Sequence, residues 1–319
     1  MDRTLLRIGL RGRRTSLRSK TLLATSASRR DAFAAAVQQF EELMAASAAV
    51  GPASRPITLY YATVQAGLAV AAAHKTDQWS FHRHGLKLHD IRPSIADITV
   101  GPEGTGAFQV VAQATGSPLL HAPVTLGALW SSLPDLKDMP LPASSASSAL
   151  DIHPNSAWSR VGARLIMTDE NPGQENFKQH LTKLLPAYPG IEGFSVVDGS
   201  YEEIRESRWV AEIRWNRRVD FDEVAPAYRY VEERFLRPSL DDQSGRPPSA
   251  LMTWWAILYT FSMLSRYRPR EWAAALDIDK SRAAHRLEYC LDLALDVLPH
   301  LVLEALDGEP MLLAKPMAF

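Results

Sequence analysis

The sequence has a single cysteine and no long apolar run, which excludes several classes of protein. Cys290 is the only cysteine among 319 residues, so neither an intrachain disulfide nor a zinc site built from several cysteines can form. The most apolar stretch, residues 250–264, is interrupted by Thr253, Thr260 and Ser262 and is too short to span a bilayer. No continuous apolar segment follows the first charges, as a secretory signal would require. We therefore expect a cytoplasmic protein with no membrane partner.

Familiar catalytic signatures are also missing. The glycine-rich stretch from Gly101 to Gly106 lacks the Lys-Ser/Thr pair of a phosphate-binding loop. No H-E-x-x-H and no G-x-S-x-G occurs, which disfavours metalloproteases and α/β-hydrolases. We expect no cofactor and no metal, and the motifs leave open whether the chain is an enzyme.

Positive charge is concentrated at the N-terminus, although the net charge of the whole chain is −1. Such a basic arm, residues 1–27, is typical of segments that contact nucleic acid or an acidic partner. The candidate contact residues are Arg11, Arg13, Arg14 and Arg18. Two other interpretations stay open: an extension that is solvated or docked on the protein, and a targeting peptide, since the arm is rich in Arg and Ser and poor in acids.

Apolar periodicity predicts helices at both ends of the sequence and strands between them. Spacings of three and four residues predict helices over residues 28–48, 57–74, 251–265 and 281–306. Alternation predicts strands over residues 107–112, 160–167, 193–197 and 208–215. In the last strand, Trp209 and Trp215 share one face, which favours a buried role for them over stacking on nucleic acid.

The order of these elements predicts an α+β fold. The apolar helices at the two ends of the chain need a shared core, which favours a discontinuous helical bundle with a β-rich region inserted into it. The predicted segments are a basic arm (1–27), a helical hairpin (28–91), a β-rich insert (92–237) and C-terminal helices that complete the bundle (238–319).

The segment from Arg83 to His89 is the sharpest candidate for chemistry. An arginine followed after five positions by a histidine is the spacing used in helical domains that cleave RNA without a metal. There, histidine moves the proton and arginine stabilises phosphate charge. The candidate catalytic residues are Arg83, His84 and His89. The alternative is structural: a loop that packs His84 beneath the helical hairpin, which the helix-breaking Gly85 favours.

Several motifs occur in a recognisable order along the chain. They are Arg55-Pro-Ile-Thr-Leu-Tyr-Tyr-Ala-Thr-Val-Gln-Ala-Gly67, His84-Gly-Leu86, Leu251-Met-Thr-Trp-Trp-Ala-Ile-Leu-Tyr259 and Met263-Leu-Ser-Arg-Tyr-Arg-Pro-Arg-Glu-Trp272. Together they resemble the YaaC-like family of bacterial proteins, in an actinobacterial-type version, over about residues 20–306. The family implies no reaction. The helix pair with Tyr60-Tyr61 also looks like the hairpin of HEPN domains, which often act in RNA cleavage or in toxin and defence systems.

Three functional hypotheses follow. The leading one is a non-enzymatic binding or regulatory protein with a protein partner or with self-association. The second is a metal-independent endoribonuclease of the HEPN type that uses Arg83 with His84 or His89. The third is binding of nucleic acid, with RNA as the expected partner, through the basic arm.

Overall fold

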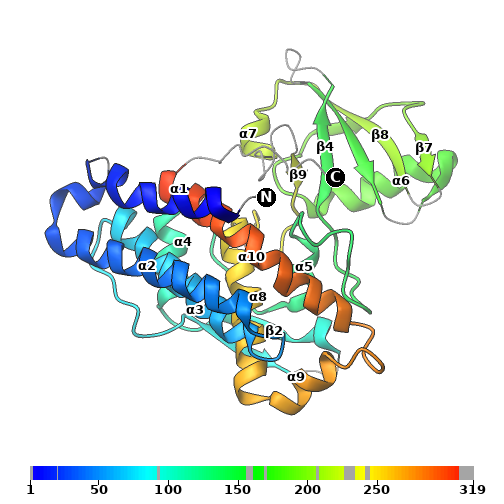
Figure 1. The fold of residues 1–319 in the computed structure, drawn as a ribbon. Helices are drawn as coiled ribbons and strands as arrows, with labels where there is room; N and C mark the ends of the chain where they lie inside the picture. The colour runs from blue at the N-terminus through cyan, green and yellow to red at the C-terminus, as the bar shows by residue number, and fades with distance from the viewer. Residues whose placement is uncertain are drawn as a thin grey trace.

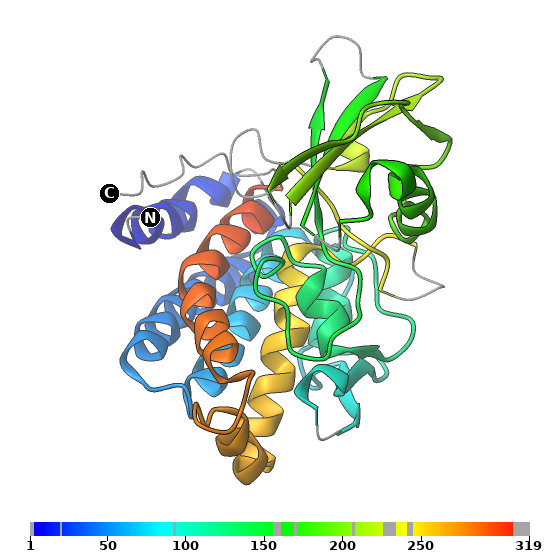
Figure 2. The same cartoon turned by 90° about the vertical axis from the view of Figure 1, so that its right-hand side faces the viewer.

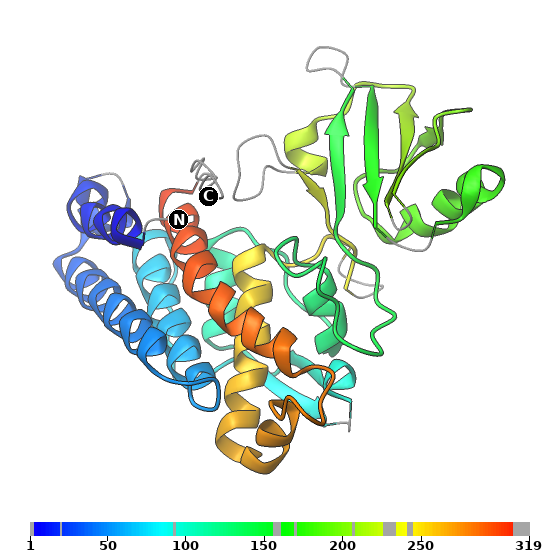
Figure 3. The ribbon, with the colours of Figure 1, turned by 45° about the vertical axis from the view of Figure 1, so that its right-hand side comes forward.

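Two units make up the protein (Figure 3), a larger helical one and a smaller one built on a sheet. The computed structural model describes residues 3–19, 21–91, 94–155, 161–168, 171–205, 208–225, 234–240 and 245–308. We call residues 3–141 together with 245–308 the helical unit, and residues 150–236 the β unit. Parts of the predicted segments 1–27, 92–237 and 238–319 lie outside the described residues.

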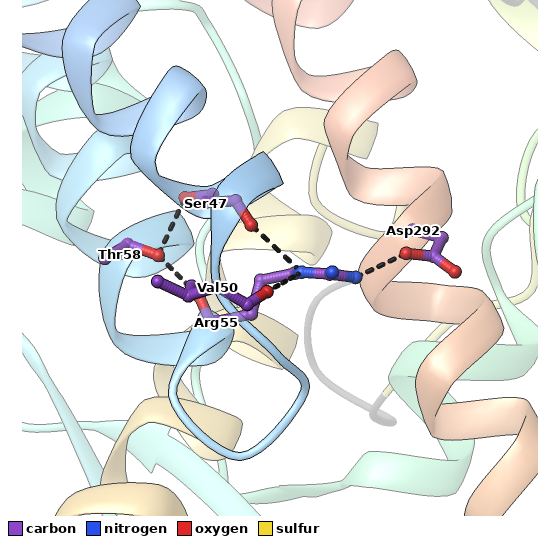
Figure 4. A network of polar contacts seen from close by, with 5 residues as sticks. All are labelled: Ser47, Val50, Arg55, Thr58 and Asp292. Atoms are coloured by element: carbon purple, nitrogen blue, oxygen red, sulfur yellow. Dashed lines mark hydrogen bonds and ion pairs between the residues drawn. The ribbon is translucent and has the colours of Figure 1, made fainter.

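The predicted helical hairpin is present as α2 (Ala27–Ala49) and α3 (Arg55–His74). Ser26 caps α2, and the break at Gly51-Pro52 separates the two helices. Figure 4 shows how Arg55 ties this turn to α10: its Nε donates to the carbonyls of Ser47 (3.0 Å) and Val50 (3.1 Å), while the guanidinium pairs with Asp292. One arginine thus closes the hairpin and attaches it to a C-terminal helix.

The C-terminal helices are α8 (Ala250–Tyr267), α9 (Pro269–Ala275) and α10 (Ala284–Asp307). Helix α3 packs against both α8 and α10, so the two ends of the chain share one core (Figures 1 and 2). A Cβ at Gly67 would lie 2.5 Å from the ring of Trp255, so glycine is what lets α3 and α8 approach closely. Helix α3 is long and apolar enough to cross a membrane, but most of it is buried, as in the core helix of a globular protein.

The basic arm forms a helix, α1 (Arg3–Ser16), that is docked on the bundle against α10 and α2. Leu6, Leu10 and Leu17 are buried in the helical core. Their spacing of four and seven residues places them on one face of a helical segment. This apolar stripe is the physical reason that the arm packs on the protein.

Between the hairpin and the β unit, a small antiparallel sheet joins the helical core. It contains β1 (Leu86–Asp90), β2 (Thr99–Pro102) and β3 (Val124–Thr125). Two short helices, α4 (Ala107–Ala114) and α5 (Leu126–Ser131), accompany it. A strand was the wrong prediction for residues 107–112, because Phe108, Val111 and Ala112 form a helical stripe that is buried in the core.

The β unit is a two-layer structure of helix on sheet. Its strands are β4 (Leu150–Pro154), β5 (Gly162–Met167), β6 (Phe194–Val196), β7 (Glu202–Arg205), β8 (Arg208–Trp215) and β9 (Phe235–Leu236). They run antiparallel in the order β6-β8-β5-β4-β9, with β7 also paired to β8. The helices of this unit are α6 (Gly173–Leu184) and α7 (Phe221–Val224).

The central strand β8 confirms the prediction from alternation. Trp209 and Trp215 are buried beneath α6 and its neighbours, whereas Arg208 and Arg214 are exposed. The two cores also divide the chain differently from the predicted insert 92–237. Residues 95–141 pack with the helices, and the second core begins at Leu150.

Candidate functional site

Polar and aromatic side chains gather where the C-terminal end of α8 meets the start of α3 and the loop before β1. We call this group the aromatic–arginine cluster. It consists of Tyr60, Tyr61, His84, Tyr259, Arg266 and Tyr267. The cluster draws on both ends of the chain, so it exists only when the discontinuous bundle is assembled.

Helical geometry decides which of these side chains reach the surface. Tyr60 is fully buried, whereas Tyr61, one residue further along α3, is 37% exposed. On α8, Tyr259 and Arg266 are seven residues apart and therefore on the same face. Tyr267 is 63% exposed. The cluster thus has a buried base, formed by Tyr60 and Tyr259, and an exposed rim.

The loop that carries His84 is fixed by the N-terminus of α4. The amide of Ala107 donates to the carbonyl of Arg83 (2.9 Å), and that of Phe108 donates to the carbonyl of His84 (3.1 Å). Gly85 has a φ of +79°, and a Cβ there would lie 1.9 Å from Oε1 of Gln109. Position 85 therefore requires glycine, because the backbone is left-handed there and a side chain would clash with Gln109.

His84 is held against the tyrosines by a hydrogen bond and by ring contacts. Its Nδ1 lies 2.8 Å from the hydroxyl of Tyr60, and its ring centroid is 5.8 Å from that of Tyr259. Partial burial and the positive charge of Arg266 lower the pKa of His84 below its ordinary value. The imidazole is therefore neutral at neutral pH.

The two buried tyrosines keep their protons. Burial raises the pKa of Tyr259 to about 12 and also raises that of Tyr60. The Tyr259 hydroxyl donates to the carbonyl of Leu86 at 2.8 Å, which joins α8 to the start of β1. Both phenols are therefore fixed hydrogen-bonding groups that position His84 and its loop.

Arg266 occupies the exposed rim between two tyrosines. Its guanidinium lies 4.9 Å from the ring centroid of Tyr267 and 5.8 Å from that of Tyr61, and it donates to both hydroxyls (3.0 and 3.2 Å). Among the residues that the structure describes, Arg266 forms no ion pair with a carboxylate. The cluster thus presents a cation stacked on aromatic rings whose charge is not neutralised locally.

The structure separates the three residues of the predicted catalytic segment. His84 belongs to the cluster, and the side chain of Arg83 is exposed next to it. His89 lies on the exposed face of β1, because Leu86 and Leu88 pack against the helical core on the opposite face. The Arg83–His89 spacing therefore runs from a loop into a strand, and it does not bring His84 and His89 to one face.

The arginines of the basic arm divide into two pairs. Arg11 pairs with Glu41 on α2 (2.9 Å), and Arg13 donates from Nε to Asp307 on α10 (3.0 Å). Within the part of the chain that the structure describes, neither Arg14 nor Arg18 forms an ion pair. Half of the predicted contact residues thus hold α1 on the bundle.

Sequence reasoning missed the rim of the cluster. Tyr60 is fully buried, but its neighbour Tyr61 is part of the exposed rim. The sequence feature that could have indicated Arg266 and Tyr267 as site residues is the cationic and aromatic stretch at the end of an apolar helix, just before Pro269. Tyr61 and Arg266 are 205 positions apart in the sequence, so their meeting depends on the tertiary packing of α3 and α8, which periodicity does not reveal.

Away from the cluster, a hollow lies at the junction of the two units and has a volume of about 440 Å³. Leu251, Leu301 and Phe235 contribute to its wall. The guanidinium of Arg237, also in the wall, already donates to three oxygens, those of Ser132, Pro248 and Thr253. Arg237 is thus committed to the fold, whereas the exposed Arg246 also lines this hollow.

Comparison with known proteins gives one family. The architecture is an α+β protein with a discontinuous helical unit and an exposed aromatic–arginine cluster. The chain belongs to the family described as YaaC-like Protein, whose family model matches residues 14–306. Comparisons with curated proteins and with solved structures find no match.

Proposed function

We propose that this protein is a binding protein that takes single-stranded nucleic acid at the aromatic–arginine cluster. The observation that carries the proposal is Arg266, a guanidinium stacked on Tyr61 and Tyr267 with no carboxylate partner among the described residues. Exposed aromatic rings stack on bases whatever their sequence, and nearby cations neutralise the phosphates. The proposal keeps the expectation of a binding protein, and it takes nucleic acid as the partner at a surface other than the basic arm.

The charges around the cluster support an anionic partner. Arg83 and Arg270 are exposed, and neither forms an ion pair within the described ranges. The acidic group whose charge reaches Tyr259 is Glu103, and its carboxylate lies 3.3 Å from the ammonium of Lys87. These arginines therefore leave positive charge near the cluster, which favours an anionic partner.

The basic arm receives less support as the nucleic-acid site. Arg11 and Arg13 are already bound to carboxylates of the bundle. Moreover, the described surface of α1 exposes no aromatic ring on which a base could stack, since the helix contains none. We therefore propose the cluster, and not the arm, as the surface that meets the bases.

The test is fluorescence anisotropy of a labelled single-stranded RNA of about 12 nucleotides, titrated with the full chain at low salt. Loss of one stacked base costs about 1–3 kcal/mol, so Tyr267→Ala should weaken binding about 5- to 150-fold, and Arg266→Gln should also weaken it. The matched control is Arg214→Gln, which removes an exposed arginine from the β unit. Equal affinity of all three variants, or no binding by the wild type, would refute the proposal.

A second candidate function is metal-independent cleavage of the bound RNA. The observation that favours it is the neutral His84, fixed by Tyr60 and close enough to Arg266 to feel its charge. In that reaction His84 takes the proton of a ribose 2′-hydroxyl, the 2′-oxygen bonds to phosphorus, and the bond to the 5′-oxygen breaks. The leaving 5′-oxygen takes a proton from solvent water, the protonated His84 later loses its proton to solvent, and the product is a 2′,3′-cyclic phosphate.

Cleavage is tested on the same RNA in EDTA, with His84→Gln and His89→Gln compared. Loss of cleavage in His84→Gln alone is expected if the cluster is the catalytic site. Loss of cleavage in both variants would favour the catalytic residues predicted from the sequence, Arg83, His84 and His89. Intact RNA at high concentration of folded protein would leave binding without cleavage.

A further inference from the structure

The outer face of α1 carries an aliphatic pair that the fold leaves uncovered. Leu5 is 63% exposed and Ile8 is 60% exposed, three residues apart and therefore adjacent on the helix surface. The buried leucines of α1, Leu6 and Leu10, face the bundle instead. The helix thus has apolar side chains on both faces, although one apolar face is enough to dock it.

The segment that carries the exposed pair is rich in arginine. Arg7, Arg14 and Arg18 form no ion pair within the described parts of the chain, and α1 contains no acidic residue. Arg11 and Arg13, in contrast, attach α1 to Glu41 and Asp307. Two arginines therefore anchor the helix, and the exposed Arg7 and Arg18 add positive charge to the same segment as the exposed aliphatic pair.

Exposed aliphatic side chains together with positive charge favour one kind of anionic partner over another. A nucleic acid has phosphates for the arginines but no apolar phase for Leu5 and Ile8. The surface of an anionic bilayer supplies both, since aliphatic side chains enter the boundary between headgroups and acyl chains while guanidinium groups bind lipid phosphates. We propose that the outer face of α1 docks the protein on an anionic lipid surface.

The arrangement of the helical unit fits such docking. Helix α1 lies along the outside of the unit, whereas α9, which follows the Arg266–Tyr267 end of α8, is at the opposite end (Figures 1 and 3). A bilayer against α1 therefore leaves the aromatic–arginine cluster open to solvent. The proposal is independent of the nucleic-acid function and departs from the sequence-based expectation of no membrane partner.

The test is sedimentation of the full chain with vesicles of phosphatidylcholine containing about 25% phosphatidylglycerol, with pure phosphatidylcholine vesicles as the neutral comparison. We expect binding to the anionic vesicles only. Ile8→Glu should reduce the bound fraction at least about fivefold, because it puts a carboxylate where an aliphatic group would insert. Arg7→Gln should give a smaller loss.

The matched control is Ile278→Glu, which makes the same substitution at an isoleucine that is 72% exposed on the segment between α9 and α10. This variant should bind like the wild type. All of these positions are at the surface, and unchanged melting temperatures would confirm that the variants fold. Absence of vesicle binding, or an equal loss in Ile8→Glu and Ile278→Glu, would overturn the proposal.

Discussion

The helical unit and the β unit solve the problem of burying a core in different ways. The helical unit joins segments from the two ends of the chain, residues 3–141 and 245–308, around one core. The β unit uses one continuous segment, residues 150–236, around a second core. Closing a long loop costs entropy before its contacts form. The helical unit therefore depends on contacts between two separate segments, whereas the contacts of the second core, the pairing of β4 with β9 included, lie within one segment.

This difference matters for function because the candidate site lies on the helical unit, which is built from two separate segments. Tyr61 and His84 come from the first segment, whereas Tyr259 and Arg266 come from the second. The aromatic–arginine cluster is thus assembled only when the chain ends meet. The β unit contributes no residue to the cluster. We therefore expect that unfolding of the β unit would leave the geometry of the rim intact.

The largest expected effect comes from cutting the chain at the boundary between the two cores. A fragment of residues 146–240 should fold, because it contains every residue of the second core. A fragment of residues 1–145 should not, because it lacks α8, whose tryptophans fill the first core. Circular dichroism and thermal melting of both fragments would check this. A cooperative transition in the N-terminal fragment would contradict the account.

Trp255→Ala should give the next largest effect. The side chain is fully buried between α8 and Gly67 of α3, so its removal leaves a cavity at the closure of the helical unit. We expect a loss of about 3–5 kcal/mol in the free energy of unfolding, measured with urea. Trp209→Ala is the comparison in the β unit, where the same chemical change should leave the cluster and its RNA affinity intact.

Gly85→Ala should destabilise the protein and disturb His84. The substitution forces a side chain into a left-handed conformation and into contact with Gln109. Gly104→Ala is a matched control, because Gly104 also has a positive φ (+60°) but an added Cβ there meets nothing within 4 Å. We expect about 1 kcal/mol of destabilisation for Gly104→Ala from the backbone alone, and clearly more for Gly85→Ala. Equal melting temperatures would argue against the close packing of this loop.

The smallest expected effect is the pH dependence that His84 contributes. Its pKa is lower in the folded protein than in the unfolded chain, so the unfolded chain binds the proton more tightly. Stability should therefore be highest above the ordinary histidine pKa of about 6.5 and fall as the pH drops below it. The loss of melting temperature between pH 7.5 and pH 5.5, taken as about one unit on either side of that value, should be smaller in His84→Gln. An identical loss in both proteins would remove His84 from this role.

Much of the fold could be predicted from the sequence, because the relevant signals are local. The stripe from Phe33 to Phe40 indicates a helix, and the alternation around Trp209 indicates a strand with a buried face. The prediction failed at residues 107–112, because a six-residue apolar run fits either a strand or a buried helix. The helix start is fixed by Gln109, whose side chain accepts from the amide of Gly106 and donates to the carbonyl of Gly85.

The candidate site was predicted only at His84. Its partners in the structure are Tyr60 and Tyr259 and not His89, because β1 alternates and turns His89 to the opposite face from the buried leucines. The exposed position of Tyr61 follows from how α8 covers α3, which the spacing of apolar residues does not show. Local pattern therefore identified a residue, and tertiary packing determined its partners.

The central claim is that nucleic acid meets the protein at the rim formed by Tyr61, Arg266 and Tyr267. The most direct measurement is photo-crosslinking of a 4-thiouridine-substituted single-stranded RNA to the full chain, followed by mass spectrometry of the modified peptides. The account predicts cross-links in the peptides that contain α3 and the C-terminal end of α8. Cross-links confined to the β unit or to α1, with none in those two peptides, would contradict it.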